Sequence, residues 1–142
     1  MFNQLTQRRA KCFIAAAMLL TVATFATSLA FAKISLNTID PVAIVADHGR
    51  HLIVTGPIIC TAGERAYVRV TVTQRTSGAV AEGNSFVTCT GALQQWEVHA
   101  LTQGAASFTP GAATAVGLGS TSARGKANDA HQWLVNVTLV EE

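Results

Sequence analysis

Four histidines are the side chains of this sequence best suited to bind a metal ion. Asp47-His48-x-x-His51 places three possible ligands within five residues. Zinc needs three or four ligands that converge on one point, so His99 and His131 could contribute only if the fold brought them close. In a context of strands and turns, the spacing does not fix where His48 and His51 point. We therefore interpret this segment as a solvated turn and predict no metal site.

Residues for hydrolytic chemistry are present, but they form no recognisable motif. The serines of GLGSTSARG lack the G-x-S-x-G spacing of a nucleophile elbow, and no helical pattern follows them. A Ser-His-Asp set assembled from distant residues stays open. Most carboxylates that could form a glycosidase pair stand in or beside turns, where such groups are solvated: Asp40, Asp47, Glu64, Glu82, Glu97 and Asp129. No phosphate-binding glycine loop occurs. We predict no enzyme activity, no catalytic residues and no cofactor.

Residues 1–32 have the order of a secretory signal peptide. Arg8, Arg9 and Lys11 precede an uncharged run over 12–32, and Ala30-Phe31-Ala32 fits the small-x-small rule of signal peptidase. The alternative is an uncleaved anchor, because the uncharged run could just span a bilayer. In both cases the rest of the chain is exported. We predict a signal peptide over 1–32, one domain over 33–142, and a secreted or extracellular protein that leaves the membrane after cleavage.

The positive net charge of the chain comes from this signal segment. The whole sequence carries a net charge of +2, whereas residues 33–142 carry seven Lys and Arg against eight Asp and Glu, a net charge of −1. A nearly neutral domain has no overall electrostatic attraction to nucleic acid or to anionic lipid. We therefore expect neither as a partner.

Cys60 and Cys89 are the two cysteines of the predicted mature chain. An exported chain meets an oxidising environment, in which an even number of cysteines indicates disulfides. A redox pair is usually close in sequence, as in C-x-x-C, and a catalytic thiol would leave one cysteine unpaired. We predict a Cys60–Cys89 disulfide. It closes a loop of roughly 30 residues and stabilises the fold by about 3–4 kcal/mol in the chain-entropy account.

Apolar and polar side chains alternate along most of the predicted domain. In 66–74, alanine and valines fall on one face, and Tyr67, Arg69, Thr71 and Thr73 fall on the other. Similar patterns predict strands at 41–46, 51–60, 85–89, 94–100, 111–122 and 131–140. Trp96 and Trp133 share faces with aliphatic residues, so we expect both in the core. About seven or eight short strands with a turn every 8–12 residues indicate an all-β, antiparallel sandwich.

The segments CTAGERAYVRVTVTQ and CTGALQQWEV resemble small secreted bacterial immunoglobulin-like domains that carry one cysteine pair. The resemblance covers 33–142 and implies an immunoglobulin-like β-sandwich and an exported location; it supplies no activity. The chain departs from antibody-type domains in three ways. Its cysteines are only 29 positions apart, both tryptophans follow Cys89, and Val87 stands where those domains have tyrosine. The antibody-type position of the disulfide is therefore not implied.

These observations lead to a functional hypothesis without a named ligand. We expect a non-enzymatic interaction module that binds a protein or cell-surface ligand, in an oligomeric state that the sequence leaves open. The candidate contact face is the polar side of 67–75: Tyr67, Arg69, Thr71, Thr73 and Arg75. A sheet edge formed by 111–122 is a second candidate. The alternatives are a hydrolase inhibitor that uses an exposed loop at 102–111, and a small hydrolase.

Overall fold

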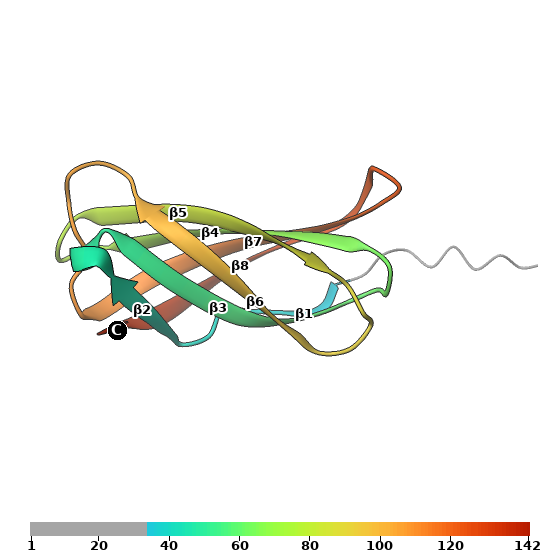
Figure 1. Cartoon of the computed structure of the whole chain (residues 1–142), viewed down its shortest axis with the longest axis horizontal. Coiled ribbons are helices and arrows are strands. Elements are labelled where there is room, and N and C mark those ends of the chain that lie inside the picture. Colours follow the sequence, from blue (N-terminus) through green and yellow to red (C-terminus); the bar gives the residue numbers. More distant parts are fainter. Residues whose placement is uncertain (1–33) are drawn as a thin grey trace, which may run out of the picture.

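The computed structural model describes residues 34–142, which form eight strands and one short 3-10 helix (Figure 1). The predicted signal peptide lies outside the described residues. In chain order the elements are β1 (Ile34–Asn37), β2 (Val42–Ala46), η1 (Asp47–Gly49), β3 (His51–Cys60), β4 (Arg65–Gln74), β5 (Ala79–Thr88), β6 (Gln94–Thr102), β7 (Gly111–Ala123) and β8 (Lys126–Glu141). The predicted strand at 51–60 is confirmed with the same bounds.

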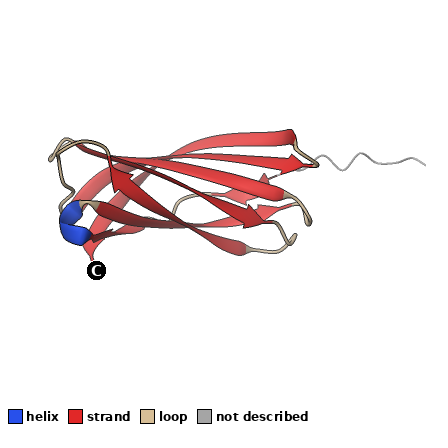
Figure 2. Ribbon diagram, turned by 45° about the horizontal axis from the view of Figure 1, so that its top comes forward, coloured by secondary structure: helices blue, strands red, loops and turns tan. Residues whose placement is uncertain are grey.

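Seven of the strands close into a barrel, so the predicted immunoglobulin-like sandwich is wrong. The order around the barrel is β3-β2-β8-β7-β4-β5-β6, and β6 pairs again with β3. Figure 2 shows the strands surrounding one interior. Six of these pairings are antiparallel, whereas β2 and β8 run parallel. The eighth strand, β1, pairs with β3 on the same edge as β2, but at the other end of β3.

Two short pairings make the difference between a sandwich and this barrel. Four residue pairs join β2 to β8, and two pairs join β5 to β6. A two-residue periodicity tells which side chains face the core, but it carries no information on which strand lies at each edge. Closure removes the free edges that a pair of open sheets would expose.

The interior is filled by the apolar side chains that alternate inward along the strands. Val68, Val70 and Val72 of β4 are fully buried, as is Trp96 of β6, which confirms the core position predicted for this tryptophan. Gly56 of β3 makes room for the indole, because a Cβ there would clash with Trp96 Cζ2 and with the Thr38 carbonyl oxygen. The ladder between β3 and β6 continues in register through this glycine.

The small residues of β7 have a similar role. Its inward face carries Ala113, Ala115, Gly117 and Gly119. The indole of Trp133 lies over Gly117, where a Cβ would approach it to within 2.5 Å, and it packs against the core while staying partly exposed. The strand predicted at 111–122 is confirmed, and the structure shows that the indole needs its face of very small residues.

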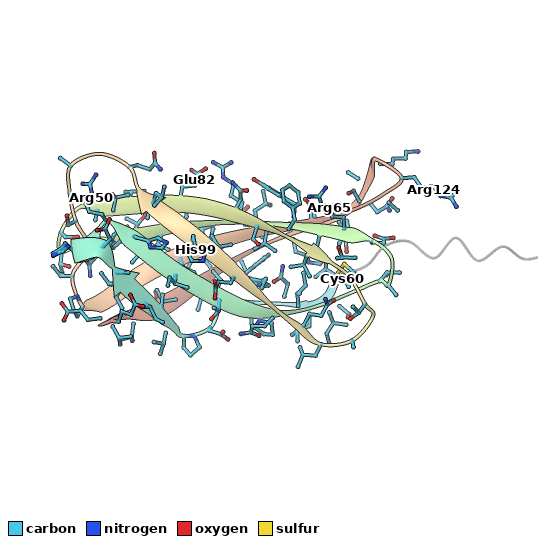
Figure 3. All side chains as sticks on the ribbon, in the orientation of Figure 1. Arg50, Cys60, Arg65, Glu82, His99 and Arg124 are labelled. Atoms are coloured by element: carbon cyan, nitrogen blue, oxygen red, sulfur yellow. A yellow bond between two sulfur atoms is a disulfide. The ribbon has the colours of Figure 1, made fainter. Side chains whose placement is uncertain are left out.

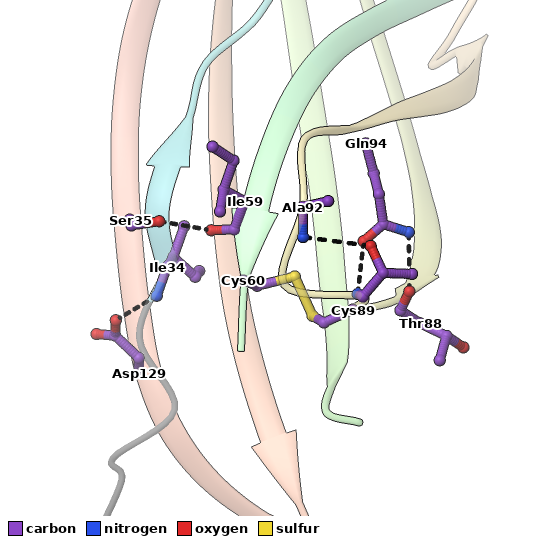
Figure 4. The surroundings of a disulfide bond; sticks show 10 residues. Ile34, Ser35, Ile59, Cys60, Thr88, Cys89, Ala92, Gln94 and Asp129 are labelled. Atoms are coloured by element: carbon purple, nitrogen blue, oxygen red, sulfur yellow. Dashed lines mark hydrogen bonds between the residues drawn. A yellow bond between two sulfur atoms is a disulfide. The ribbon is translucent and has the colours of Figure 1, made fainter. Parts of the chain in front are cut away.

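The barrel has two ends that differ in how they are held together (Figure 1). We call them the η1 end, which carries η1, the β4–β5 turn, the β6–β7 loop and the C-terminal residues, and the disulfide end. The predicted disulfide is present: Cys60 at the end of β3 and Cys89 just after β5 have Cα atoms 5.3 Å apart (Figure 4). It is compatible with an oxidising, extracellular location. The part of the chain that the structure describes has no helix with the length and hydropathy needed to cross a bilayer.

Candidate functional site

The predicted contact face lies on the outside of the barrel, along β4. The side chains of Tyr67, Arg69, Thr71 and Thr73 alternate with the buried valines and point to solvent, and Arg75 follows in the exposed turn to β5. Strand β4 pairs with β5 on one side and β7 on the other over nearly its whole length. Outward side chains of β5, β7 and β8 therefore extend the same surface, which we call the β4 face.

An aromatic cluster that the sequence analysis did not identify stands at one end of this face. Phe86 of β5 lies directly across from Tyr67, with ring centroids 5.1 Å apart, and its side chain is 53% exposed. The guanidinium of Arg65 lies 4.0 Å from the centroid of the Phe86 ring, a cation–π contact. The sequence does indicate the outward position of Phe86. Val87 and Cys89 share one face of the strand, so if they face the core, Phe86 must face outward.

The middle of the β4 face carries an ion pair. Arg69 Nη2 lies 2.6 Å from Glu82 Oε1 of β5, and both side chains are exposed. The hydrogen bond from Arg69 lowers the pKa of Glu82, and the same bond to Glu82 raises the pKa of Arg69. Glu82 thus fixes the position of the Arg69 side chain and offsets its charge, while Arg65 and Arg75 have no carboxylate partner among the described residues.

Exposed leucines continue the β4 face on the side of β7 and β8. Leu118 lies across from Arg69, and Leu134 of β8 lies across from Val116. Leu134 is 66% exposed. A shallow hollow of about 170 Å³ is lined by Arg69, Thr71, Val116, Leu118 and Gln132. Arginine beside exposed aromatic and aliphatic side chains is the composition that protein interfaces favour.

The second predicted contact, a sheet edge at 111–122, is wrong. Strand β7 pairs with β4 from Thr114 to Ser122 on one side and with β8 along its whole length on the other. Its backbone groups are therefore already used within the barrel, and no second chain can pair with it. The small side chains of this strand make room for Trp133.

The loop predicted at 102–111 is held firmly at the η1 end, between β6 and β7. Arg50 Nη1 donates to the carbonyls of Gly104 and Ala105 at 3.0 and 3.2 Å. On the other side of the loop, the buried side chain of Gln74 donates to the Thr109 carbonyl and accepts from the Thr109 amide. Phe108 is buried and its amide donates to the Gly49 carbonyl. Residues 103–105 are left exposed between these anchors.

The fold brings two of the four histidines together. His51 of β3 and His99 of β6 are diagonal neighbours on the outside of the barrel, with His51 Nε2 and His99 Nδ1 2.9 Å apart. His99 Nε2 lies 2.9 Å from Glu97 Oε1. His48 stands apart beside Asp47, and His131 contacts Asp129. Within residues 34–142, no group of three or more His, Cys, Asp or Glu side chains is placed to hold one metal ion.

The candidate carboxylates do not gather at one site. Asp40 accepts hydrogen bonds from Thr55 and Gln95, Glu82 binds Arg69, and Glu97 binds His99. Asp129 accepts a hydrogen bond from the backbone amide of Ile34, and this bond is the main reason that the pKa of Asp129 is lowered. Glu64 is buried at the disulfide end, and its Oε2 has no hydrogen-bond partner among the described residues.

The comparison with known proteins adds no assignment. No model of a known protein family matches the chain, and no curated protein matches it either.

Proposed function

We propose that this protein is an exported, non-enzymatic interaction module, and that its β4 face binds an acidic surface of a partner protein that also carries apolar side chains. The observation that carries the proposal is the coexistence of exposed arginines and exposed apolar side chains on one face. Phe86, Leu118 and Leu134 supply apolar area, and Arg65 and Arg69 supply charge and hydrogen-bond donors. Arginine and aromatic side chains are enriched where proteins meet, and arginine is common among the residues that provide most of the binding energy.

The distribution of charge supports an acidic partner. Three of the seven basic residues after position 32 lie on β4 or on the turn that follows it: Arg65, Arg69 and Arg75. Glu82 of β5 pairs with Arg69 among them, and Glu64 beside Arg65 is buried (Figure 3). On the other side of the barrel, the outer surface of β3 and β6 carries Glu97 and neighbouring Asp40. A domain of nearly zero net charge therefore has a cationic side, which favours encounter with an acidic surface.

Capture from the source cells tests this proposal. The exported protein is immobilised and the bound proteins of the cell surface and medium are quantified by mass spectrometry. We expect Arg69→Glu/Arg75→Glu and Phe86→Ser each to lose a partner that the natural chain captures. The matched controls are Arg124→Glu/Lys126→Glu, with the same charge change at the β7–β8 hairpin, and Leu93→Ser, which alters a leucine 63% exposed in the β5–β6 loop. A partner that all variants retain would contradict the proposal.

A hydrolase inhibitor is the second candidate, because the 103–110 loop is held by contacts on both sides. Binding a loop that is already ordered costs less entropy, which is how a rigid loop gains affinity for an enzyme cleft. Incubation with a panel of purified proteases and glycosidases, with residual activity measured against inhibitor concentration, tests this alternative. Arg50→Ala, which removes both contacts to Gly104 and Ala105, should weaken any inhibition, whereas the variants of the β4 face should not.

A further inference from the structure

The two paired histidines lie on the side of the barrel away from the β4 face, and they form a connected chain with a carboxylate. Glu97, His99 and His51 are joined by two contacts of 2.9 Å, and the two imidazoles stack with centroids 4.9 Å apart and an angle of 20° between the rings. The group projects from β3 and β6, which are held in register by eight residue pairs. His99 is 56% exposed, so solvent and ions reach the group (Figure 3).

The hydrogen bonds define which nitrogens carry protons when both rings are neutral. Glu97 is an acceptor when ionised, so His99 Nε2 carries the hydrogen that it donates to the carboxylate. His99 Nδ1 then carries a lone pair and accepts from His51 Nε2. A metal ion can take the place of the shared hydrogen if the His51 proton moves to Nδ1. Both neighbouring nitrogens are then ligands, and no proton is gained or lost.

We propose that His51 Nε2 and His99 Nδ1 bind a copper(II) ion, with Glu97 holding His99 in the metal-binding orientation. Two nitrogens about 2.0 Å from one ion lie about 2.8 Å apart when the bonds meet at 90°, as in square-planar coordination, and about 3.3 Å apart in a tetrahedron. The separation of 2.9 Å is that of the present hydrogen bond, and it places both nitrogens within reach of one ion. Copper(II) is the divalent ion that imidazole sites bind most tightly in the general order of affinity. The His51 imidazole must turn so that its lone pair meets that of His99 at the ion, and water completes the coordination.

Glu97 supplies the feature that separates this pair from two histidines that merely lie close. Metal-binding histidines almost always donate their other ring N–H to a carboxylate, a carbonyl or water, which fixes the tautomer and makes the ligand nitrogen more basic. His99 has this contact to Glu97. His131 also contacts a carboxylate, since its Nε2 lies 3.1 Å from Asp129 Oδ2, but its other nitrogen has no second imidazole as partner. The chain thus contains its own matched control.

Titration of the exported protein with copper(II), in the presence of glycine as a competing chelator, tests the site. Paramagnetic broadening of backbone amide signals in NMR spectra reports where the ion binds. We expect the broadening to centre on His51, Ile53, Glu97 and His99. His51→Ala and His99→Ala should each reduce the affinity to that of the double variant. Glu97→Gln should weaken binding by about 10–100-fold, the usual effect of losing such a supporting carboxylate. Nickel(II) should bind the same residues more weakly, following the general order of divalent metals.

The control variant is His131→Ala, which should bind copper(II) as tightly as the natural chain. All substituted side chains lie on the outside of the barrel, so thermal melting without metal should be unchanged and shows that each variant is folded. His99→Gln serves as a second variant if His99→Ala melts early. Unchanged affinity in the double histidine variant, or broadening centred on the chain's N-terminus, would overturn the proposal. Neither result depends on whether the β4 face binds a partner.

Discussion

At two places in the barrel wall, neighbouring strands pair over only a few residues: β2 with β8, and β5 with β6. We call these places the first and the second seam. Each is closed by backbone pairing at the η1 end but by side chains at the disulfide end. At the η1 end, β2 pairs with β8 and β5 pairs with β6. At the disulfide end, the first seam is bridged by β1, whose Ile34 amide donates to Asp129 of β8 at 3.0 Å. The second seam is bridged by the disulfide and by Gln94, which donates to the Thr88 carbonyl at 2.9 Å (Figure 4).

Among the described residues, buried polar side chains also differ between the two ends: they have hydrogen-bond partners at the η1 end and lack some at the disulfide end. Gln74, at the η1 end of β4, is buried but has partners for its side chain: the Thr109 carbonyl, the Thr109 amide and the Ser77 hydroxyl. Glu64, just before the other end of β4, is buried with one oxygen unpartnered. Thr121 Oγ1 and Asn37 Nδ2 are also buried without partners among the described residues. Because unpaired buried polar groups cost free energy, the disulfide end should be the less stable part of the barrel.

The two ends should therefore differ in their sensitivity to redox conditions and to pH. A backbone ladder responds little to redox conditions or to mild acid, whereas a disulfide can be reduced and a carboxylate can be protonated. Chemical changes should therefore open the barrel from the disulfide end while the η1 end stays paired. Amide hydrogen exchange, which reports local opening, separates the two ends directly.

The largest effect is expected from Trp96→Ala. Trp96 fills the interior beside Gly56, and its Nε1 donates to Asn37 Oδ1 at 3.1 Å, which also joins β6 to β1. Removal of a buried tryptophan should cost about 3–5 kcal/mol of unfolding free energy, measured by urea denaturation. Trp133→Ala should cost less, because that indole is partly exposed. An equal loss in the two variants would show that partial exposure does not lower the contribution of Trp133.

Loss of the disulfide should have the next largest effect. Cys60→Ser/Cys89→Ser removes a bridge with a sequence separation of 29. The unfolding free energy should fall by about 2–5 kcal/mol, and reduction of the natural chain should have the same effect. Amide exchange should increase mainly in 59–65 and 87–94, while the β2–β8 and β5–β6 pairs stay protected at the η1 end. Uniform loss of protection would contradict the proposed difference between the ends.

The sequence predicted the strands better than their arrangement. Strand β3 and the inward valines of β4 were predicted correctly because alternation directly reports burial of one face. Strand β1 was missed because four residues carry too little pattern, and the first half of β5, AVAEGN, has weak alternation. The β2–β8 pairing could not be predicted, since a parallel contact between residues near 42 and 138 leaves no local trace in either strand.

The candidate sites were predictable to different degrees. The outward position of Tyr67 and Arg69 followed from alternation, but their neighbours Phe86 and Leu118 come from other strands and depend on register. The same limit applies to His51 and His99, which lie 48 positions apart and meet only because β3 pairs with β6. Spacing in the sequence instead indicates His48 and His51 as neighbours, but their side chains contact different partners in the fold.

Asp129→Asn tests the other side-chain bridge, and its effect depends on pH. The amide of Ile34 lowers the pKa of Asp129, so this carboxylate stabilises the folded chain at pH values above the unfolded pKa. At neutral pH the variant should be less stable by about 1 kcal/mol, because its neutral amide oxygen is a weaker acceptor. As the pH falls below about 4 and through the folded pKa, the natural chain should lose this advantage. Urea midpoints measured between pH 2 and 7 should therefore converge at the acid side; parallel curves would show that Asp129 does not hold β1.

The smallest effect is expected for the Arg69–Glu82 ion pair. Both side chains are exposed, and the strands that carry them are already joined by ten residue pairs. Glu82→Gln should leave the unfolding free energy unchanged within error, since exposed pairs lose in entropy and screening most of what they gain.

The ion pair should still change the pKa of Glu82, which is measured from its carboxyl chemical shift as the pH is varied. Arg69→Gln should raise the pKa of Glu82 towards its ordinary value, because the hydrogen bond from Arg69 is what lowers it. The pKa of Asp129 serves as the control and should stay the same. The contrary outcome is that Glu82→Gln destabilises the chain as much as Asp129→Asn does. Side-chain contacts would then contribute equally where the backbone is fully paired and where it is not. That result would contradict the proposed difference between the two ends of the barrel.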